Sequence, residues 1–440
     1  MKTSFYNFFY DLDGANYIAY NSMSNSLALM SHEEYDDYLL FEHDNTMYID
    51  EGLLDQLRHG GFIIEDDVDE LSIIRHSMLQ SRYSSSHLGL TIAPTADCNF
   101  RCIYCYEKDK YSSCMMDRKT IESIINFVLL KANDIKTFHV SWYGGEPLLA
   151  LDVIERLSNQ FIQISHEHNI SYSAGIITNG YLLTEENAKR LAKCQITDCQ
   201  VTIDGSEQQH NINRPLLSGE GTYTVIINNI FGAAPFLKHI SVRVNSDKRD
   251  LNAAVDVLSR FRNSAFTNVT VYPAPIKNKK GCFRSSSCFS CQEFLLFEEQ
   301  FYDKNADNRQ YCSKYPVLRG NVCVADSCNG FVIASDGEMY KCWSDIGCPE
   351  MSIGNINSNL RNLSKEIVYL KNDPTADERC SICKLLPICM GGCPYEIYNG
   401  VSDRCFTMSD IHRKYITKIA KIMLQKQQDS KRREQNEVYC

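Results

Sequence analysis

Three cysteines constrain this chain more than any other feature. The segment 91–107, TIAPTADCNFRCIYCYE, places Cys98, Cys102 and Cys105 at C-x3-C-x2-C spacing just after a short apolar run. Three thiolates can hold three corners of a four-iron cluster, whereas a closed [4Fe–4S] site takes four cysteines. The missing thiolate leaves one iron open, which is typical of a metal site that does chemistry. The alternatives for the same residues are a zinc knuckle or three core cysteines.

The chain has 20 cysteines among 440 residues. Its N-terminus lacks the long apolar run and cleavage site of a signal peptide. We therefore expect a cytoplasmic protein, in which clustered cysteines indicate metal sites rather than disulfides. The net charge of −10 argues against nucleic acid or an anionic membrane as a partner. No apolar run reaches the length of a membrane span.

Strand-like and helix-like segments alternate from about residue 88 to 275. The predicted strands are 88–95, 137–145, 172–180, 198–205, 239–246 and 268–275. The predicted helices include 118–132, 150–165, 184–194 and 251–263. This alternation predicts βαβ units around a parallel sheet. Six units are too few to close an eight-stranded barrel.

Polar residues follow several of these predicted strands. The candidates are Gly144, Gly145 and Glu146 after the second strand, Thr178 and Asn179 after the third, Asp204 after the fourth, and Arg243 and Asn245 on the fifth. In α/β folds, ligands bind at the carboxyl ends of strands. Two glycines allow a close backbone approach, a carboxylate could accept from an ammonium, and an arginine can bind a carboxylate bidentately. A structural salt bridge or turn is the alternative for each residue.

The cysteine loop, with Tyr106 and Glu107 after it, resembles the signature loop of the radical S-adenosylmethionine (SAM) superfamily. The resemblance implies that the open iron chelates the methionine part of SAM. It also implies that an electron, from a donor such as flavodoxin or ferredoxin, splits SAM to a 5′-deoxyadenosyl radical that abstracts hydrogen. The fold implied for residues 87–280 is a partial (β/α)6 barrel.

The same resemblance assigns cofactor contacts. Gly144, Gly145 and Glu146 match the GGE motif at the SAM amino group, and Thr178 and Asn179 match a ribose-contacting position. Arg243 and Asn245 match an Arg-x-Asn pattern at the SAM carboxylate or ribose. Tyr104, Tyr106 and Asp204 complete the implied set. Asp204 is followed by His210 and Arg214, as in the family's DG…HD..R run, but Asn211 stands where the run has Asp, so no role is transferred to His210.

A second cysteine pattern lies near the C-terminus. Cys380, Cys383, Cys389 and Cys393 have C-x2-C-x5-C-x3-C spacing, and Cys405 follows. Cys323 and Cys342 flank a predicted hairpin, FVIASDGEMYKC, with a turn at Asp336-Gly337. Residues 323–407 thereby resemble the SPASM domain of radical SAM peptide maturases. Four zinc-bound thiolates are the alternative.

The SPASM resemblance implies two auxiliary [4Fe–4S] clusters. Auxiliary cluster I would take Cys323, Cys342 and Cys393, with Cys328 or its competitor Cys348 as fourth ligand. Auxiliary cluster II would take Cys380, Cys383, Cys389 and Cys405. The bridging segment 281–322 contains Cys282, Cys288, Cys291 and Cys312, for which unliganded thiols are favoured over another metal site. Cys114, Cys194, Cys199 and Cys440 are interpreted as incidental, and 408–440 as a helix with a charged tail.

Residues 1–86 contain no cysteine and no catalytic motif. Short predicted strands precede a helix that opens with Ser31 and Glu34 in capping-box spacing. This small α+β unit resembles the winged-helix recognition element of peptide-modifying enzymes, which holds a precursor's leader by strand addition. A structural cap on the barrel is the alternative.

The sequence therefore predicts a radical SAM/SPASM enzyme that crosslinks a ribosomally made precursor peptide. The predicted cofactors are SAM and three [4Fe–4S] clusters, one SAM-binding and two auxiliary. A thioether is the favoured product, with a carbon–carbon bond next. The alternatives are an anaerobic sulfatase-maturing enzyme, which makes formylglycine, and a non-catalytic iron–sulfur or zinc-binding interaction protein.

Overall fold

The structure is a computed structural model that describes residues 1–105, 107, 115–248, 251–262, 266–276, 288–305, 307–358, 360–401, 405 and 409–437. The chain divides into two compact units. The first unit comprises Met1–Arg82, Tyr302–Val322 and Asn372–Cys440, and the second comprises Tyr83–Phe301 and Cys323–Lys371. The five segments predicted from the sequence follow chain order, whereas each unit gathers parts that are far apart in the chain.

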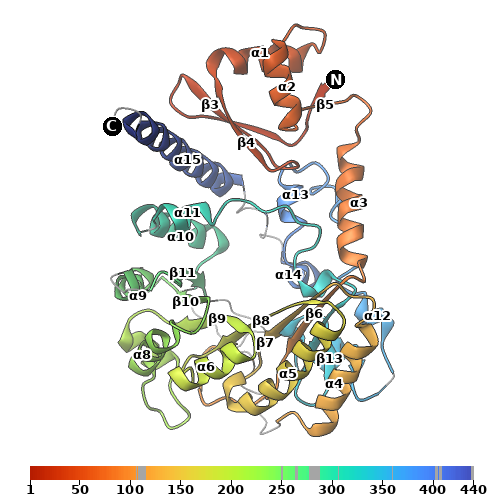
Figure 1. Cartoon of the computed structure of the whole chain (residues 1–440), viewed down its shortest axis with the longest axis vertical. Helices are drawn as coiled ribbons and strands as arrows, with labels where there is room; N and C mark the ends of the chain where they lie inside the picture. Colours follow the sequence, from red (N-terminus) through yellow and green to blue (C-terminus); the bar gives the residue numbers. More distant parts are fainter. Residues whose placement is uncertain are drawn as a thin grey trace. The chain divides into compact units, whose positions relative to one another are not determined.

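The second unit is built on a nine-stranded sheet with the order β11-β10-β9-β8-β7-β6-β12-β13-β14 (Figure 1). The six predicted strands are confirmed, and neighbours are parallel: β6 (His87–Ile92), β7 (Thr137–Trp142), β8 (Ser171–Thr178), β9 (Ile196–Ile203), β10 (His239–Ser246) and β11 (Val269–Pro275). The helices between or after them are α4 (Arg118–Lys131), η2 (Pro147–Ala150), α5 (Leu151–Glu167), α6 (Glu185–Lys193), α7 (Glu207–Asn213), α8 (Tyr223–Ala233), α9 (Ala253–Arg262) and α10 (Cys291–Asn305). This is the predicted α/β arrangement of a partial (β/α)6 barrel.

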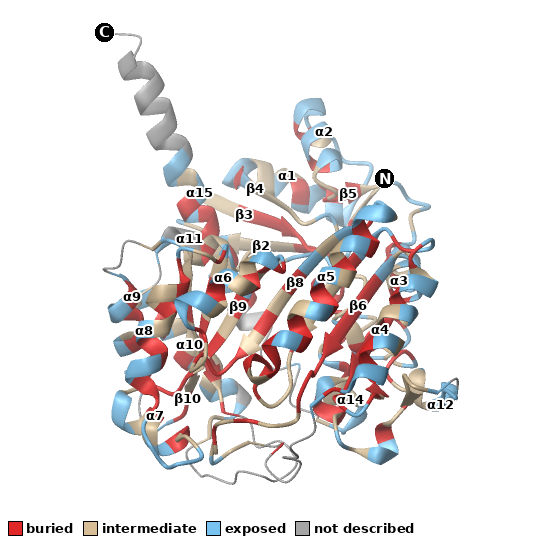
Figure 2. Cartoon of the chain, turned by 60° about the horizontal axis from the view of Figure 1, so that its bottom comes forward, coloured by how far each residue is buried: buried red, intermediate tan, exposed pale blue. Residues whose placement is uncertain are grey.

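These strands bury alternate residues, because successive side chains point to opposite faces of a sheet. In β10, Ile240, Val242 and Val244 are fully buried, while Arg243 and Asn245 are half-buried. In Figure 2 the helices carry both buried and exposed residues, and in α5 the buried residues include Ile154, Leu157 and Phe161, which recur at the spacing of one helix face. The half-buried polar residues therefore lie on the sheet face that points away from the helices.

A hairpin extends the sheet beyond β6. β12 (Gly330–Ile333) runs parallel to β6, and β13 (Glu338–Tyr340) returns antiparallel to β12 before pairing with β14 (Gly354–Asn355). The predicted turn is confirmed, with Gly337 at φ +83°, which favours glycine. The short helices η4 (Val324–Asp326), η5 (Trp343–Asp345), η6 (Pro349–Met351) and α12 (Leu363–Glu366) lie around this hairpin in the chain.

The first unit contains a three-stranded antiparallel sheet of β2 (Asn7–Asp11), β3 (Asn16–Asn21) and β4 (Ser26–Ser31). The other elements are β1 (Lys2–Thr3), which pairs with β5 (Ile63–Ile64), and the helices α1 (His32–His43), α2 (Glu51–His59), α3 (Glu70–Tyr83), α11 (Asn308–Cys312), α13 (Leu386–Cys389), α14 (Pro394–Tyr398) and α15 (Ser409–Glu437). The capping box of Ser31 and Glu34 is confirmed at the start of α1.

Both faces of this small sheet are covered. One face buries Ala19 and Met30 against Tyr38 and Phe41 of α1. On the other face, Ile18 and Tyr20 pack with Ile416 and Ala420 of α15. The C-terminal helix therefore completes the core of the N-terminal strands. In the described part of the chain, no helix is long and apolar enough to cross a membrane.

Candidate active site at the carboxyl ends of the barrel strands

The three cysteines of the loop after β6 lie together. Burial raises the pKa of the Cys98 thiol to about 12, and the negative charges of Glu146, Cys102 and Cys105 add to the effect. Burial also raises the pKa of Cys102 to about 11. Metal binding would deprotonate such thiols. Three thiols, with no fourth cysteine in the set, fit the donors of an open iron–sulfur cluster.

The backbone of the cysteine loop pairs with the last residue of α7 and with the chain that follows it. Arg101 N donates to Pro215 O at 2.9 Å, and Ile103 N donates to Asn213 O at 3.0 Å. Leu217 N donates to Asn99 O at 2.8 Å. These bonds fix the loop, whose described residues belong to no helix or strand.

Gly144 and Gly145 pack against the same loop. A Cβ on Gly144 would lie 2.6 Å from Thr95 O, and a Cβ on Gly145 would overlap Asp97 O. Gly144 also has φ +121°. The sequence interpretation required these glycines for the approach of a ligand, whereas here they are required for the approach of the loop backbone. Their contact with SAM stays a prediction.

Glu146 ties the ends of two strands together. Its carboxylate is fully buried and accepts from Thr178 Oγ1 at 2.7 Å, Asn179 N at 2.7 Å and Leu148 N at 3.0 Å. Burial raises its pKa, and these hydrogen bonds lower it. The Asn179 side chain reaches the cysteine loop, where Nδ2 donates to Asn99 Oδ1 at 2.8 Å. If the ammonium group of SAM binds Glu146, as predicted, it would share the carboxylate oxygens with these three hydrogen-bond donors of the protein.

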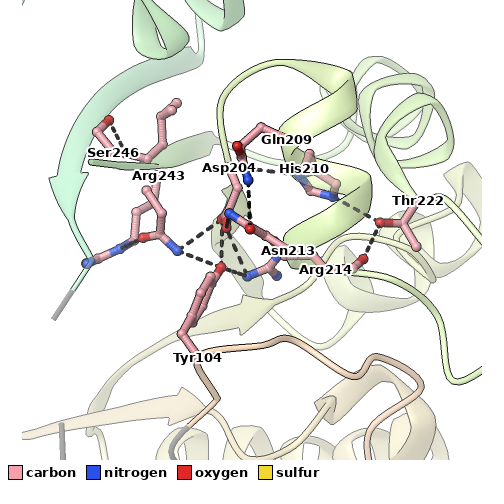
Figure 3. Close-up of polar contacts among 11 residues, drawn as sticks. Tyr104, Asp204, Gln209, His210, Asn213, Arg214, Thr222, Arg243 and Ser246 are labelled. Atoms are coloured by element: carbon pink, nitrogen blue, oxygen red, sulfur yellow. Dashed lines mark hydrogen bonds and ion pairs between the residues drawn. The ribbon is translucent and has the colours of Figure 1, made fainter. Parts of the chain in front are cut away.

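Tyr104 joins the cysteine loop to β9 and β10 (Figure 3). Its hydroxyl donates to Asp204 Oδ1 at 2.7 Å and accepts from Arg214 Nη1 and Asn245 Nδ2, each at 3.0 Å. Asn245 Nδ2 also lies 3.1 Å from Asp204 Oδ1, and Arg243 Nε donates to Asn245 Oδ1 at 3.0 Å. The structure therefore brings four predicted cofactor contacts, Tyr104, Asp204, Arg243 and Asn245, into one hydrogen-bonded network.

Asp204 and Arg214 form the charged centre of this network. Arg214 Nη1 lies 4.0 Å from Asp204 Oδ1, and the two side chains are 8% and 1% exposed. Burial raises the pKa of Asp204, while Arg214 and the hydrogen bonds from Tyr104, Asn213 and Asn245 lower it. Asn213 Nδ2 donates to Asp204 Oδ2 at 3.1 Å. Asn213 escaped sequence reasoning, because no motif marks an asparagine in a short helix as a carboxylate's partner.

His210 holds the turn behind Asp204. Its Nδ1 accepts from Asp204 N at 3.1 Å, so Nε2 carries the proton and donates to Thr222 Oγ1 at 3.0 Å. Thr222 Oγ1 donates in turn to Arg214 O at 2.8 Å (Figure 3). Burial lowers the pKa of His210 to about 2, so the ring is neutral. A buried, neutral ring with both nitrogens bonded positions the turn.

The auxiliary cluster II candidates share the first unit. Burial raises the pKa of Cys380 to about 12, and Asp377, Cys405 and Cys389 add to the effect. Burial likewise raises the pKa of Cys389, with contributions from Cys383 and Cys405. Each of the four thiols therefore lies within electrostatic range of others in the set. Four such thiols fit the donor set of a closed cluster.

The auxiliary cluster I candidates are divided between the units. Cys323, Cys328, Cys342 and Cys348 belong to the second unit, and Cys393 belongs to the first. The Cys328 thiol donates to Ser84 O at 3.5 Å. The buried Lys341 donates from Nζ to Ser327 O at 2.5 Å and Gly330 O at 2.6 Å, which braces the turn around Cys328. This ligand set stays a prediction.

The structure does not describe every residue that the sequence analysis names. Tyr106, Cys114, Cys282 and Cys440 fall outside the described residues, as does the side chain of Cys291. No cysteine whose side chain is described takes part in a disulfide. Among the described residues, no three His, Cys, Asp or Glu side chains could hold a single metal ion. This finding concerns sites for a single ion. The thiolates of a cubane bind different irons, so they lie farther apart than the ligands of one ion.

Comparison with known proteins adds four findings. Residues 92–233 match the model of the Radical SAM superfamily. The chain is 27% identical over 343 residues to the cysteine-type anaerobic sulfatase-maturating enzyme of Clostridium perfringens strain 13, across 70% of this chain and 88% of that enzyme. Native anSMEcpe with bound AdoMet matches with a TM-score of 0.56 at 19% identity, covering 76% of this chain and 98% of that one. SuiB of Streptococcus suis bound to precursor peptide SuiA matches with a TM-score of 0.50 at 14% identity, covering 90% and 96%.

Proposed function

Because this chain is a radical SAM enzyme, we propose that it matures a ribosomally made precursor peptide by installing a crosslink. The observation that carries the proposal is the N-terminal α+β module, which the barrel chemistry does not need. The likeness to SuiB, solved with a precursor peptide, extends over 90% of this chain. The likeness to native anSMEcpe extends over 76%. A thioether is the favoured product, and a carbon–carbon bond is the next candidate.

The residues of the site would have two separate roles, to hold the cluster and to hold SAM. Cys98, Cys102 and Cys105 would hold the SAM-binding cluster, which with SAM supplies the 5′-deoxyadenosyl radical. The residues that would hold SAM are Tyr104, Gly144, Gly145, Glu146, Thr178, Asn179, Asp204, Arg243 and Asn245. Tyr104 ties the loop to β9, and Glu146 fixes the ends of β7 and β8. These ties keep the reacting groups in one geometry without reorganisation.

The two auxiliary clusters belong to the same proposal. Cys380, Cys383, Cys389 and Cys405 would hold auxiliary cluster II. Cys323, Cys342 and Cys393 would hold auxiliary cluster I, with Cys328 or Cys348 as fourth ligand. Flavodoxin or ferredoxin would be the electron donor.

A leader peptide would bind the N-terminal sheet by strand addition. β2 and β4 are its edge strands. Asn7 O of β2 already accepts from Lys384 Nζ at 3.0 Å. No other strand in the described part of the chain pairs with the outer edge of β4. We therefore assign the leader to β4.

The second candidate function is anaerobic sulfatase maturation, which the 27% identity to the Clostridium perfringens enzyme favours. Reconstituted protein, SAM and reductant should be given either a precursor peptide from a neighbouring reading frame or a sulfatase peptide. A crosslinked precursor loses two hydrogens and keeps its sulfur. A cysteine converted to formylglycine loses its sulfur. Formylglycine in the sulfatase peptide with an unchanged precursor would favour the second candidate.

A further inference from the structure

The N-terminal module and the cysteine segment that follows Asn372 share a hydrophobic core inside the first unit. Tyr6, Ile74 and Met78 come from the module and are at most 3% exposed. They pack with Leu386 and Met390, which flank Cys389 in the chain. Cys380 is partly buried against the same cluster. Helix α3 thereby lies beside α13 (Figure 1).

Polar contacts hold the residue next to Cys383 as well. The Ser22 hydroxyl donates to Lys384 O, across 362 positions of sequence. Lys384 Nζ donates to Asn7 O at 3.0 Å and lies 5.8 Å from the centre of the Phe5 ring. Both the backbone and the side chain of Lys384 are therefore tied to the N-terminal module.

Tyr6 brings a buried phenol to the same place. Burial is the main cause that raises the pKa of Tyr6 to about 12, and the charges of Glu70 and then Cys383 contribute to this rise. The Cys383 thiol is thus within electrostatic range of the Tyr6 hydroxyl. Tyr6 itself is 1% exposed.

We propose that the N-terminal module forms one wall of the auxiliary cluster II site, with Ser22 as a positioning residue for Cys383. The proposal rests on the ligand set Cys380, Cys383, Cys389 and Cys405 and gives the module a second task besides peptide recognition. A cubane requires fixed thiol positions, and the loop between Cys383 and Cys389 has only one short helix to order it. The module orders that loop from outside, as groups around metal ligands do in other sites. Metal binding is then coupled to the folding of the module.

The test compares serine variants of the full chain after anaerobic reconstitution. Ser22→Ala removes the donor to Lys384 O, while Ser22→Thr keeps a hydroxyl. Ser24→Ala is the matched control, because the Ser24 hydroxyl donates to Gly60 O within the module. We expect Ser22→Ala to lose the iron of one cluster to a chelator several-fold faster than wild type. We also expect a shift in that cluster's EPR spectrum, with Ser22→Thr and Ser24→Ala close to wild type.

Two further variants separate the possible failures. In one outcome, Ser22→Ala loses iron at the wild-type rate and has the wild-type EPR spectrum, while Cys383→Ala lacks one cluster. This outcome would overturn the proposal that the module forms a wall of the site. A wild-type iron load in Cys383→Ala would overturn the ligand set, and the wall with it. If Ser22→Ala does not fold, Tyr6→Phe tests the same wall against Tyr20→Phe, whose hydroxyl bonds to Asn25 Oδ1 instead. A shifted EPR spectrum in Tyr6→Phe, with the wild-type spectrum in Tyr20→Phe, supports the proposed wall. Wild-type spectra in both variants overturn it.

Discussion

The two cysteine groups of this chain are supported in different ways. The loop of Cys98, Cys102 and Cys105 is fixed by hydrogen bonds and a buried ion pair within the barrel unit. The group that includes Cys380 and Cys389 rests mainly on an apolar core that begins at Tyr6, to which the hydrogen bonds of Lys384 with Ser22 and Asn7 are added. The proposed role of the loop, to hold the cluster that binds SAM, would benefit from polar contacts, because hydrogen bonds fix direction as well as distance. The second group, proposed to hold a closed cluster, would depend less on direction, so that packing can supply most of its support.

The largest effect should come from removing the loop thiols. Replacing Cys98, Cys102 and Cys105 by Ala should abolish SAM cleavage and remove about four of roughly twelve irons, four per cubane. The auxiliary sets should keep their iron, because their cysteines are untouched. Iron analysis and chromatography of 5′-deoxyadenosine measure both effects. Cys199→Ala, a buried thiol outside the predicted sets, should change neither, and wild-type cleavage by the triple variant would refute the assignment.

Breaking the buried ion pair of Asp204 and Arg214 should lower the free energy of unfolding more than breaking a surface ion pair. Arg214→Met leaves the Asp204 carboxylate buried and unpaired, which costs about 3–5 kcal/mol. Arg190→Met breaks pairs with the more exposed Asp152 and Glu155 and should cost about 0–1 kcal/mol. Urea unfolding of the apoprotein followed by tryptophan fluorescence measures the difference.

Tryptophan fluorescence reports on the unfolding of the second unit, which contains the barrel. Trp142 and Trp343 are the chain's two tryptophans, and both belong to that unit. A double variant, Arg214→Met with Asp204→Asn, should regain part of the loss. Equal costs for Arg214→Met and Arg190→Met would mean that the pair does not support the loop.

Tyr104→Phe should have a smaller effect, about 1.5–3 kcal/mol, the range for a hydrogen bond to a charged group. The change removes one hydroxyl and keeps the ring, so the loop loses its bond to Asp204 and little packing. Tyr181→Phe is the control, since the Tyr181 ring also contacts the loop, through Phe100. The same unfolding assay should separate the two variants. No difference between them would show that the Tyr104 hydroxyl does not anchor the loop.

The smallest effect should be a pH dependence from His210. Its folded pKa of about 2 lies below the ordinary 6.5, so the unfolded chain takes up the proton first. Stability therefore falls as the pH drops below about 6.5, by about 1.4 kcal/mol per pH unit for this group. His210→Gln should flatten that slope between about pH 6.5 and pH 5. An unchanged slope in His210→Gln would contradict the prediction.

The barrel was predictable because its pattern is local. β10 was predicted at 239–246 and lies at His239–Ser246. Parallel strands bring their carboxyl ends to one edge, so the proximity of Asp204 and Asn245 followed from their positions. Their partners did not follow, since the sequence interpretation assigned them to SAM and the structure bonds them to Tyr104.

The support of Cys383 was not predictable. The sequence indicates a small α+β module around Tyr6 and a metal site around Cys383, and no motif connects them. Apolar residues such as Ile74 and Met78 predict burial but do not specify what they pack against, because hydrophobic packing is not directional. Contacts of this kind come from tertiary structure.

Hydrogen transfer from the peptide tests the central claim most directly. A fully deuterated precursor peptide should be incubated in ordinary water with the reconstituted enzyme, SAM and reductant. If this enzyme crosslinks the precursor, mass spectrometry should find 5′-deoxyadenosine that carries one deuterium, together with a peptide that has lost two hydrogen isotopes. Unlabelled 5′-deoxyadenosine in the amount formed without peptide, with the precursor unchanged, would contradict the account.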